Sequence, residues 1–434
     1  MSSPHAHETA LSFADLGLPE RLVSALTHRG ITHPTPIQAR ALPDALAGHD
    51  LLGRAQTGSG KTLAFGLPLL TRFAGDRSGN APRACRALVV VPTRELAEQV
   101  KEAIAPLAHG LGLRVTAVYG GASMQRQVLA LQRGVDVLVA TPGRLEDHLR
   151  QGTCTLGQVE VTVLDEADYM TDLGFLPAVT RLLDQVPTGT QRLLFSATLD
   201  REVDGLVRRY LVDPVRHAVA PAVSHIETME HRAFTVKAED KIAVTAEIAA
   251  RPGRTLLFVR TKHGADRLAR QLCKTGVAAG AIHGDLRQSQ RRRALESFTT
   301  GHARVLVATD VAARGIHVDG IDLVVHFDPP NDPKGYLHRS GRTARAGSSG
   351  VVLSLLLPHE VRGSAQLHRR LRTGVVPTRV APGHEAVRDL ATSGTPVVVR
   401  PPAAGGGHGP GRPQRGRPRR QGRKRPPYKG RRAA

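Results

Sequence analysis

Aromatic residues and cysteines are scarce in this 434-residue chain. Aromatics make up 3% and Trp is absent, so the cores must rest on Leu, Val, Ala and Ile. The three cysteines, Cys85, Cys154 and Cys273, lie far apart and form no C-x-x-C pair. That spacing argues against a zinc ribbon or a disulfide framework. It predicts three reduced thiols in a cytoplasmic protein.

Long apolar runs are missing, and acidic residues are few relative to basic ones. No run reaches the roughly 18 to 20 apolar residues of a membrane span. Residues 1–10 have no apolar segment of the kind found in signal peptides. With 60 Lys and Arg against 38 Asp and Glu, the net charge is +22. Such an excess predicts a polyanionic partner, and without membrane features that partner is nucleic acid.

Short β-branched runs recur along the chain, each followed by a turn and a helical pattern. Continuous apolar strands alternating with helices predict an α/β fold with parallel sheets covered on both faces. Residues 215–229 lack strong periodicity and divide the strands into two groups. We therefore expect domains over 12–214 and 230–375, joined by a linker at 215–229. The expected strands lie at 86–91, 135–140, 159–164, 192–195, 255–259, 304–308 and 321–327.

The C-terminal residues 376–434 are expected to form a basic, mostly disordered tail. Residues 401–434 carry eleven Lys and Arg and no acidic residue, so half of the net charge lies there. A Gly-, Pro- and Arg-rich segment of this kind cannot bury a core. It could tether RNA through phosphate contacts or serve as a solubilising tail. The agreement of charge sign and clustering favours the tether.

The segment AQTGSGKT, from Ala55 to Thr62, has the composition of a phosphate-binding loop. Glycines let backbone N–H groups turn toward phosphates, and the following helix points the positive end of its dipole at them. We expect Lys61 to reach the β- and γ-phosphates of ATP and the Thr62 hydroxyl to hold Mg²⁺. Ala55 stands where the usual pattern has Gly, and taken alone the motif could be a Gly-rich turn.

An apolar strand at 161–164 is followed by Asp165-Glu166-Ala167-Asp168. Asp165 is expected to bind Mg²⁺ directly or through water. Glu166 could orient or deprotonate the attacking water. Acidic residues after a strand often mark only a helix N-terminus, but beside a phosphate loop they indicate ATP hydrolysis.

A third motif, HRSGRTAR at 338–345, places Arg342 and Arg345 three residues apart, on one face of a helix. Guanidinium groups suit the charge that develops on a transferring phosphoryl group. Supplied from the second domain, they would make hydrolysis depend on closure of the cleft. Alone, the run could equally be a solvated basic face. The expected catalytic residues are Lys61, Asp165, Glu166, Arg342 and Arg345.

In this order the motifs resemble those of DEAD-box RNA helicases of superfamily 2, bacterial type, over about residues 13–357. The resemblance implies two RecA-like domains in tandem and an ATP hydrolase that unwinds short RNA duplexes or remodels RNA–protein complexes. The family's loop itself begins with Ala, which accounts for Ala55. Gln38, in the segment TPIQ, would read the adenine edge, with Phe13 near the base. The implied nucleotide-binding set is Phe13, Gln38, Ala55, Gln56, Thr57, Gly58, Ser59, Gly60, Lys61, Thr62, Asp310 and Gly315.

The resemblance also implies RNA contacts and a set of residues that couple the ATP state to unwinding. From the residues alone, Thr, Gly and Arg at strand ends can donate to phosphates without reading bases, although each could be an ordinary loop. The implied RNA contacts are Pro92, Thr93, Arg94, Gly120, Gly121, Thr141, Gly143, Arg144, Phe258, Thr261, Gln288, Arg291 and Thr309. The implied coupling residues are Ser196, Thr198, Asp168 and His338.

Three positions depart from the family pattern. His317 stands where Asp is usual, which puts one ribose contact in doubt, Ala344 replaces a usual Gly, and Tyr169 replaces a usual Arg. Two other functions stay open: a translocating helicase of the same superfamily, and a non-enzymatic RNA-binding scaffold. The intact motifs argue against both. Ribosome assembly, RNA decay and cold adaptation are all open as pathways.

Overall fold

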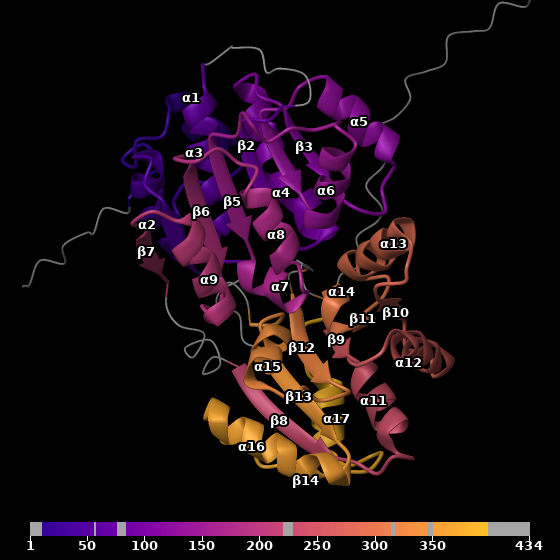
Figure 1. The fold of residues 1–434 in the computed structure, drawn as a ribbon. Helices are drawn as coiled ribbons and strands as arrows, with labels where there is room; N and C mark the ends of the chain where they lie inside the picture. Colours follow the sequence, from indigo (N-terminus) through magenta and orange to yellow (C-terminus); the bar gives the residue numbers. More distant parts are fainter. Residues whose placement is uncertain are drawn as a thin grey trace, which may run out of the picture. The chain divides into compact units, whose positions relative to one another are not determined.

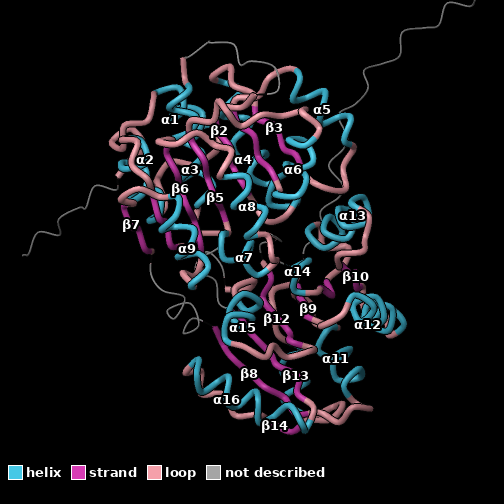
Figure 2. The backbone as a smooth tube through the Cα atoms, viewed as in Figure 1, coloured by secondary structure: helices cyan, strands magenta, loops and turns pink. Residues whose placement is uncertain are grey.

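The computed structural model describes residues 11–55, 58–75, 84–219, 229–313, 318, 320–344 and 350–397. These residues form two lobes, each built on a seven-stranded parallel sheet (Figure 1). Strands and helices alternate along the chain, and helices lie on both faces of each sheet (Figure 2). The expected pair of RecA-like α/β domains is thus confirmed. In the described part of the chain, no helix is both long and apolar enough to cross a membrane.

The sheet of the first lobe has the strand order β3-β4-β2-β5-β6-β1-β7. Its strands are β1 (Leu51–Arg54), β2 (Ala87–Val90), β3 (Val115–Val118), β4 (Val137–Ala140), β5 (Val161–Asp165), β6 (Gln191–Ser196) and β7 (Val215–Ala218). Its helices are α1 (Glu20–His28), α2 (Pro36–Leu46), α3 (Lys61–Phe73), α4 (Arg94–Gly110), α5 (Met124–Gln132), α6 (Pro142–Arg150), α7 (Ala167–Asp172), α8 (Leu176–Leu183) and α9 (Arg201–Tyr210).

The sheet of the second lobe has the order β10-β11-β9-β12-β13-β8-β14. Its strands are β8 (Met229–Thr235), β9 (Arg254–Phe258), β10 (Ala279–Ile282), β11 (Val305–Ala308), β12 (Ile321–His326), β13 (Gly350–Leu356) and β14 (Thr378–Arg379). Its helices are α11 (Lys241–Ala249), α12 (Lys262–Lys274), α13 (Gln288–Thr299), α14 (Asp310–Ala313), α15 (Pro333–Ser340), the 3₁₀ turn η1 (Pro358–Glu360), α16 (Val361–Leu371) and α17 (Glu385–Thr392).

The cores are aliphatic, as the composition requires. In the first lobe, the two faces of the sheet belong to two separate clusters of buried side chains, one with α1 to α4 and one with α7 to α9. The central strands β2 and β4 are buried at every position. That double burial explains why they read as continuous apolar runs rather than as alternating ones. All seven expected strands are present.

Two expected boundaries are wrong. The linker was expected to start at 215, but β7 pairs there with β1 and completes the first sheet. The second domain was expected to end at 375, but β14 pairs with β8 and α17 packs beside α11. Buried Val387 and Leu390 hold α17 in the apolar core of the second lobe. The rest of the expected tail, from 398 onward, lies outside the described residues.

Candidate active site

The phosphate loop joins β1 to α3 at the carboxyl edge of the first sheet. Ala55 is buried directly after the strand, and α3 begins at Lys61. Gly58 and Gly60 both have positive φ, +88° and +96°, a region that glycine enters without steric cost. Backbone N–H groups in such turns form a concave anion-binding surface. Gln56 and Thr57, also expected in this loop, lie outside the described residues.

Gln38 links the segment expected to read adenine to the phosphate loop. Its Nε2 donates to the Gly60 carbonyl oxygen at 2.9 Å, and its Oε1 accepts from the Thr35 backbone N–H at 2.9 Å. The side chain is 2% exposed, so its position is set by these two bonds. Phe13 lies in the apolar core of the same lobe and is 1% exposed. Its place beside a base therefore stays a prediction.

Lys61 meets the acidic box at the end of β5. Its Nζ lies 3.1 Å from Glu166 Oε1 and 3.7 Å from Asp165 Oδ1. Burial disfavours the ammonium, but Glu166, Asp165 and Asp168 outweigh burial and raise the pKa of Lys61 above its ordinary value. Burial is also the main cause that raises the pKa of Asp165 to about 6, with Lys61 opposing the rise. The lysine thus stays charged, as the expected phosphate contact requires.

Glu166 adopts the left-handed conformation, with φ of 56° and ψ of 47°. A non-glycine residue pays roughly 1–2 kcal/mol for this geometry, and such strain is concentrated at functional sites. The strain turns the chain between β5 and α7, so that Asp165 and Glu166 both contact Lys61.

The donors present suit a magnesium ion. Mg²⁺ takes oxygen ligands, commonly one or two carboxylates together with substrate phosphates and water. Asp165 supplies a buried carboxylate, and Thr62 supplies a hydroxyl at the second position of α3. Among the described residues, no group of three or more His, Cys, Asp or Glu could hold a metal ion without a substrate.

The four expected coupling residues form one network. Asp168 Oδ2 accepts from the Thr198 backbone N–H at 2.9 Å and from Thr198 Oγ1 at 2.8 Å. The Asp168 N–H donates to Ser196 Oγ at 3.2 Å. His338 Nε2, from the second lobe, lies 4.0 Å from Asp168 Oδ2. The acidic box, the end of β6 and helix α15 therefore meet at one buried carboxylate.

The arginine motif begins on α15 and continues past its end. Arg342 is buried, and its Nε donates to the His338 carbonyl oxygen at 3.3 Å. Arg345 lies outside the described residues, so the cross-cleft role of both arginines stays a prediction. Arg339, which sequence reasoning did not single out, donates to both carboxylate oxygens of Asp310, at 2.6 and 2.7 Å. The position of Arg339 inside the HRSGR motif was the sequence feature that could have identified it.

Many of the expected RNA contacts line a single pocket of about 600 Å³. Close to it, Gly121 has φ of +82°, and a Cβ there would lie 2.3 Å from Arg94 Nη1. Only glycine lets that guanidinium approach the loop. The expected residues that line the pocket are Pro92, Thr93, Arg94, Gly120, Thr141, Gly143, Arg144 and Arg291.

The other expected RNA residues do not all lie at this surface. Phe258 is buried, and the Arg339 guanidinium carbon lies 5.3 Å from the centroid of the Phe258 ring. Thr309 is buried as well. Thr261 Oγ1 caps α12 by accepting from the Gly264 N–H. Gln288 begins α13. Arg291 lines the pocket, but its Nε donates to Glu95 Oε1 at 2.7 Å, a bond that sequence reasoning missed.

Comparison with known proteins decides the family. Residues 35–206 match the DEAD/DEAH box helicase family, and residues 240–347 match the helicase conserved C-terminal domain. The DEAD-box ATP-dependent RNA helicase CshA of Geobacillus kaustophilus is 39% identical over 83% of this chain and 76% of its own length. The chain belongs to the DEAD-box helicase family.

Other relatives extend the comparison. The chloroplastic DEAD-box ATP-dependent RNA helicase 3A of Zea mays is 43% identical over 83% of this chain. The chain spans about half the length, 49%, of that relative. The structure resembles S. cerevisiae Dbp5 bound to RNA and ADP BeF3, with a TM-score of 0.76, 28% identity, and coverage of 88% of this chain and 100% of Dbp5.

Two departures from the DEAD-box pattern have a visible structural setting. Ala344 has φ of +52°, which explains why Gly is usual there. Tyr169 is 3% exposed, and its hydroxyl donates to the Val311 carbonyl oxygen of the second lobe at 2.9 Å. His317, which put one ribose contact in doubt, lies outside the described residues, and so does Gly315 of the expected nucleotide-binding set.

Proposed function

We propose that this DEAD-box protein hydrolyses ATP in response to RNA and locally separates short RNA duplexes or remodels RNA–protein complexes. The observation that carries the proposal is the contact of Lys61 with Asp165 and Glu166 at the phosphate loop. The same acidic box continues into the Asp168–Thr198 network, and residues expected to bind RNA line one pocket of the described structure. Dbp5, which this chain resembles, is bound to RNA and ADP BeF3.

In this proposal each residue has a defined task. Lys61 exchanges its carboxylate partners for the β- and γ-phosphates of ATP. Asp165 and Thr62 hold Mg²⁺, which would neutralise charge on the phosphates. Glu166 accepts a proton from the attacking water, and Arg342 and Arg345 stabilise the charge on the transferring phosphoryl group.

RNA would bind across both lobes through phosphate contacts that do not read bases. The coupling must then be reciprocal, because RNA tightens ATP binding by the same factor by which ATP tightens RNA binding. The basic tail would add affinity by releasing counterions from RNA. The RNA–protein complexes of ribosome assembly and of RNA decay are the candidate targets, and sequencing RNA fragments crosslinked to the protein in cells would distinguish them.

Glu166→Gln tests the chemistry. The amide keeps the size of the side chain but cannot accept the proton, so ATP binding should persist while RNA-stimulated turnover falls about 10²–10⁴-fold. Glu102→Gln is the matched control, because Glu102 lies exposed on α4. Unimpaired turnover in Glu166→Gln would remove that residue from the mechanism. Absence of ATPase activity in the unmodified chain, both with and without RNA, would favour the non-enzymatic RNA-binding scaffold instead.

The length of the duplex distinguishes local unwinding from translocation. A local unwinder bends and releases a short stretch of one strand, so its rate should fall steeply as the duplex lengthens. A translocating motor should keep unwinding. Rates measured on a series of duplexes with one common single-stranded end decide between the two.

A further inference from the structure

The second lobe has a pocket of its own, at the carboxyl edge of its sheet. Strand β10, which follows β9 in the chain, lies to one side of β9 in the sheet, and β12 lies on the other side. The strand order therefore reverses between β9 and β12, which are paired neighbours. In open parallel sheets, ligands bind outside the carboxyl ends of the strands at such a reversal. Arg260 follows β9 there, and Pro329, Pro330 and Asn331 follow β12.

The first lobe uses the same position. Its strand order reverses between β2 and β5. The residues that follow these two strands are Pro92 and Thr93, which line the expected RNA pocket, and Glu166, which contacts Lys61. The corresponding edge of the second lobe is therefore a position that suits a phosphorylated ligand.

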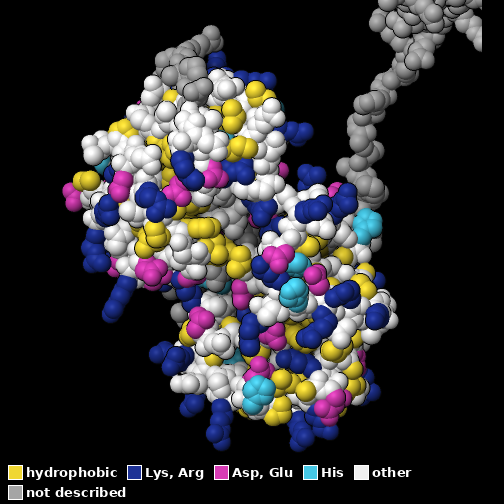
Figure 3. Space-filling view, turned by 45° about the vertical axis from the view of Figure 1, so that its right-hand side comes forward, with side chains coloured by type: hydrophobic (Ala, Val, Ile, Leu, Met, Phe, Trp, Pro, Cys, Tyr) yellow, Lys and Arg dark blue, Asp and Glu magenta, His cyan; other side chains and the backbone are white. Residues whose placement is uncertain are grey.

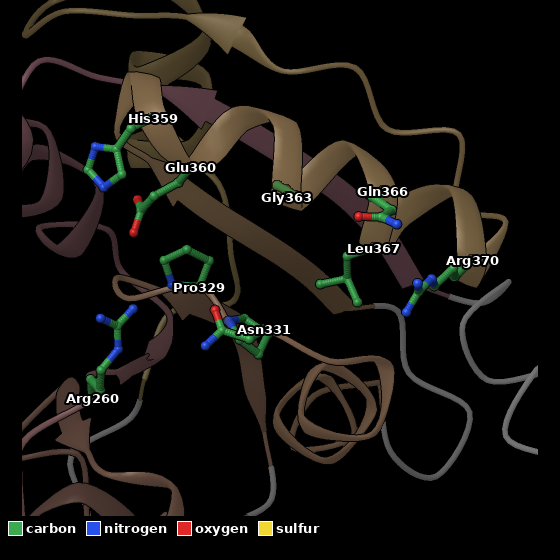
Figure 4. A pocket seen from close by; sticks show the side chains of 11 residues that line it. Arg260, Pro329, Asn331, His359, Glu360, Gly363, Gln366, Leu367 and Arg370 are labelled. Atoms are coloured by element: carbon green, nitrogen blue, oxygen red, sulfur yellow. The ribbon is translucent and has the colours of Figure 1, made fainter.

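The walls of the second-lobe pocket combine cationic ends with an apolar floor. It encloses about 360 Å³, within the range of small-ligand sites. In Figure 4 the guanidinium groups of Arg260 and Arg370 enter from opposite sides, with Pro329 and Leu367 between them. Both arginines are exposed, and within the described part of the chain neither guanidinium has a hydrogen-bond or salt-bridge partner.

The charge around the pocket favours an anion. Its single carboxylate, Glu360, already accepts the Leu357 N–H at 2.8 Å through Oε2. Helix α16, which forms one wall, carries Arg362, Arg369 and Arg370 and no acidic residue within its bounds. Lys and Arg elsewhere on the surface are interspersed with acidic side chains on the face drawn in Figure 3. The wall formed by α16 thus offers cationic side chains and no carboxylate of its own.

Two polar side chains beside the apolar floor suit a nucleotide rather than a bare ion. The side-chain amides of Asn331 and Gln366 offer both donors and acceptors. Pro329 and Leu367 give an apolar surface on which the face of a base can pack. We propose that this pocket binds one phosphorylated nucleotide, with one phosphate at Arg260, another at Arg370, and its base over Pro329 and Leu367 between them.

The RNA strand is the source of that nucleotide that the structure favours. Arg260 directly precedes Thr261, an expected RNA contact outside the 600 Å³ pocket. An RNA strand that leaves that pocket, the main groove, and reaches Thr261 therefore comes to the second-lobe pocket next. The subsite would lengthen the RNA footprint beyond the main groove. This inference rests on the proposed function, since it requires that RNA bind to the second lobe. A free nucleotide has the same chemistry and is separated from RNA by the test below.

The experiment compares Arg260→Ala and Arg370→Ala with Arg369→Ala. Arg369 is the matched control because it is exposed on the same helix, does not line the pocket, and donates within its own helix to the Ala365 carbonyl. Dissociation constants are measured by fluorescence anisotropy for a short single-stranded RNA that fills only the main groove and for a longer one, at several salt concentrations. A parallel titration with ADP counts the nucleotide equivalents bound.

Loss of one phosphate contact should weaken binding of the longer RNA several-fold and lower the salt slope by about 1 in each pocket variant. Binding of the short RNA and the ATPase rate that it stimulates should not change, which keeps the proposed function separate from the subsite. Loss of a second ADP equivalent, with RNA binding unchanged, would assign the pocket to free nucleotide. If the pocket variants match Arg369→Ala with both probes, the proposal is overturned.

Discussion

Replacing Gly60 by Ala should damage the nucleotide site more than the same change at Gly58, although both glycines lie in the phosphate loop. Both have positive φ, which costs an L-residue about 1–2 kcal/mol. At Gly58 that strain is the whole expected penalty, because an added Cβ meets no atom of the described residues within 4 Å. Comparing the two variants therefore separates the cost of backbone strain from the cost of a steric clash.

At Gly60 the added Cβ would lie 2.6 Å from Gln38 Nε2 and 2.6 Å from Thr35 Oγ1. Gln38 must then move and lose its bonds to the Gly60 carbonyl and to the Thr35 N–H. One lost hydrogen bond costs about 1 kcal/mol, and the lost cap of α2 costs about 1 kcal/mol more. The free energy of unfolding should therefore fall by about 2 kcal/mol more in Gly60→Ala than in Gly58→Ala.

Thermal unfolding and nucleotide titration check this difference. About 2 kcal/mol corresponds to a Tm lower by roughly 4–8 °C for a domain of about 150–250 residues. Since Gln38 is expected to read the adenine edge, Gly60→Ala should also lose its preference for ADP over GDP. Gly58→Ala should weaken the binding of ADP and of GDP by the same factor. Equal Tm values for the two variants, or an unchanged preference in Gly60→Ala, would refute the reasoning.

Two further predictions follow from buried polar groups. Thr198→Val removes the hydroxyl that donates to Asp168 but keeps the side chain's shape; it should lower RNA unwinding more than RNA-stimulated ATPase, and an unchanged ratio of the two rates would contradict the coupling role. Burial, together with the charge of His231, lowers the pKa of His368 to about 4, whereas an unfolded His titrates near 6.5. The unfolded chain binds the additional proton between these values, so stability should fall as the pH drops from about 6.5 to about 4. The dependence of Tm on pH should flatten in His368→Asn but not in the exposed control His302→Asn, and identical profiles would exclude His368 as the cause.

The sequence was sufficient for most strands that are buried throughout and insufficient where burial is partial, although β13, buried at six of its seven positions, was also missed. The strands predicted from continuous apolar runs include β2, β4 and β11, which are buried at every position. The missed strands include β7 and β10, whose side chains are largely half-buried or exposed. A strand at or near a sheet edge packs on fewer neighbours, so its composition need not be apolar. The boundaries at 215 and 375 were wrong for the same reason.

The candidate site divides in a similar way. Residues expected to contact phosphate or metal could be named from the sequence, because that chemistry fixes both residue type and spacing. Contacts between side chains far apart in the sequence were not. The bond from Gln38 to Gly60 and the pair formed by Arg339 and Asp310 arise only once the sheets are assembled. Neither contact leaves a local pattern in the sequence.

The second lobe shows why a shared strand order does not by itself create an ATP site. Lys241 begins α11 after β8, as Lys61 begins α3 after β1. The loop before it, residues 236–240, contains no glycine and two acidic residues, so it offers neither a positive-φ turn nor a favourable field for phosphates. Lys241 Nζ instead lies 4.6 Å from the centroid of the Phe327 ring, and burial lowers its pKa, with Glu360 and Asp328 opposing. The glycines before Lys61, rather than the lysine or the sheet, therefore account for a phosphate-binding loop in the first lobe that the second lobe lacks at this position.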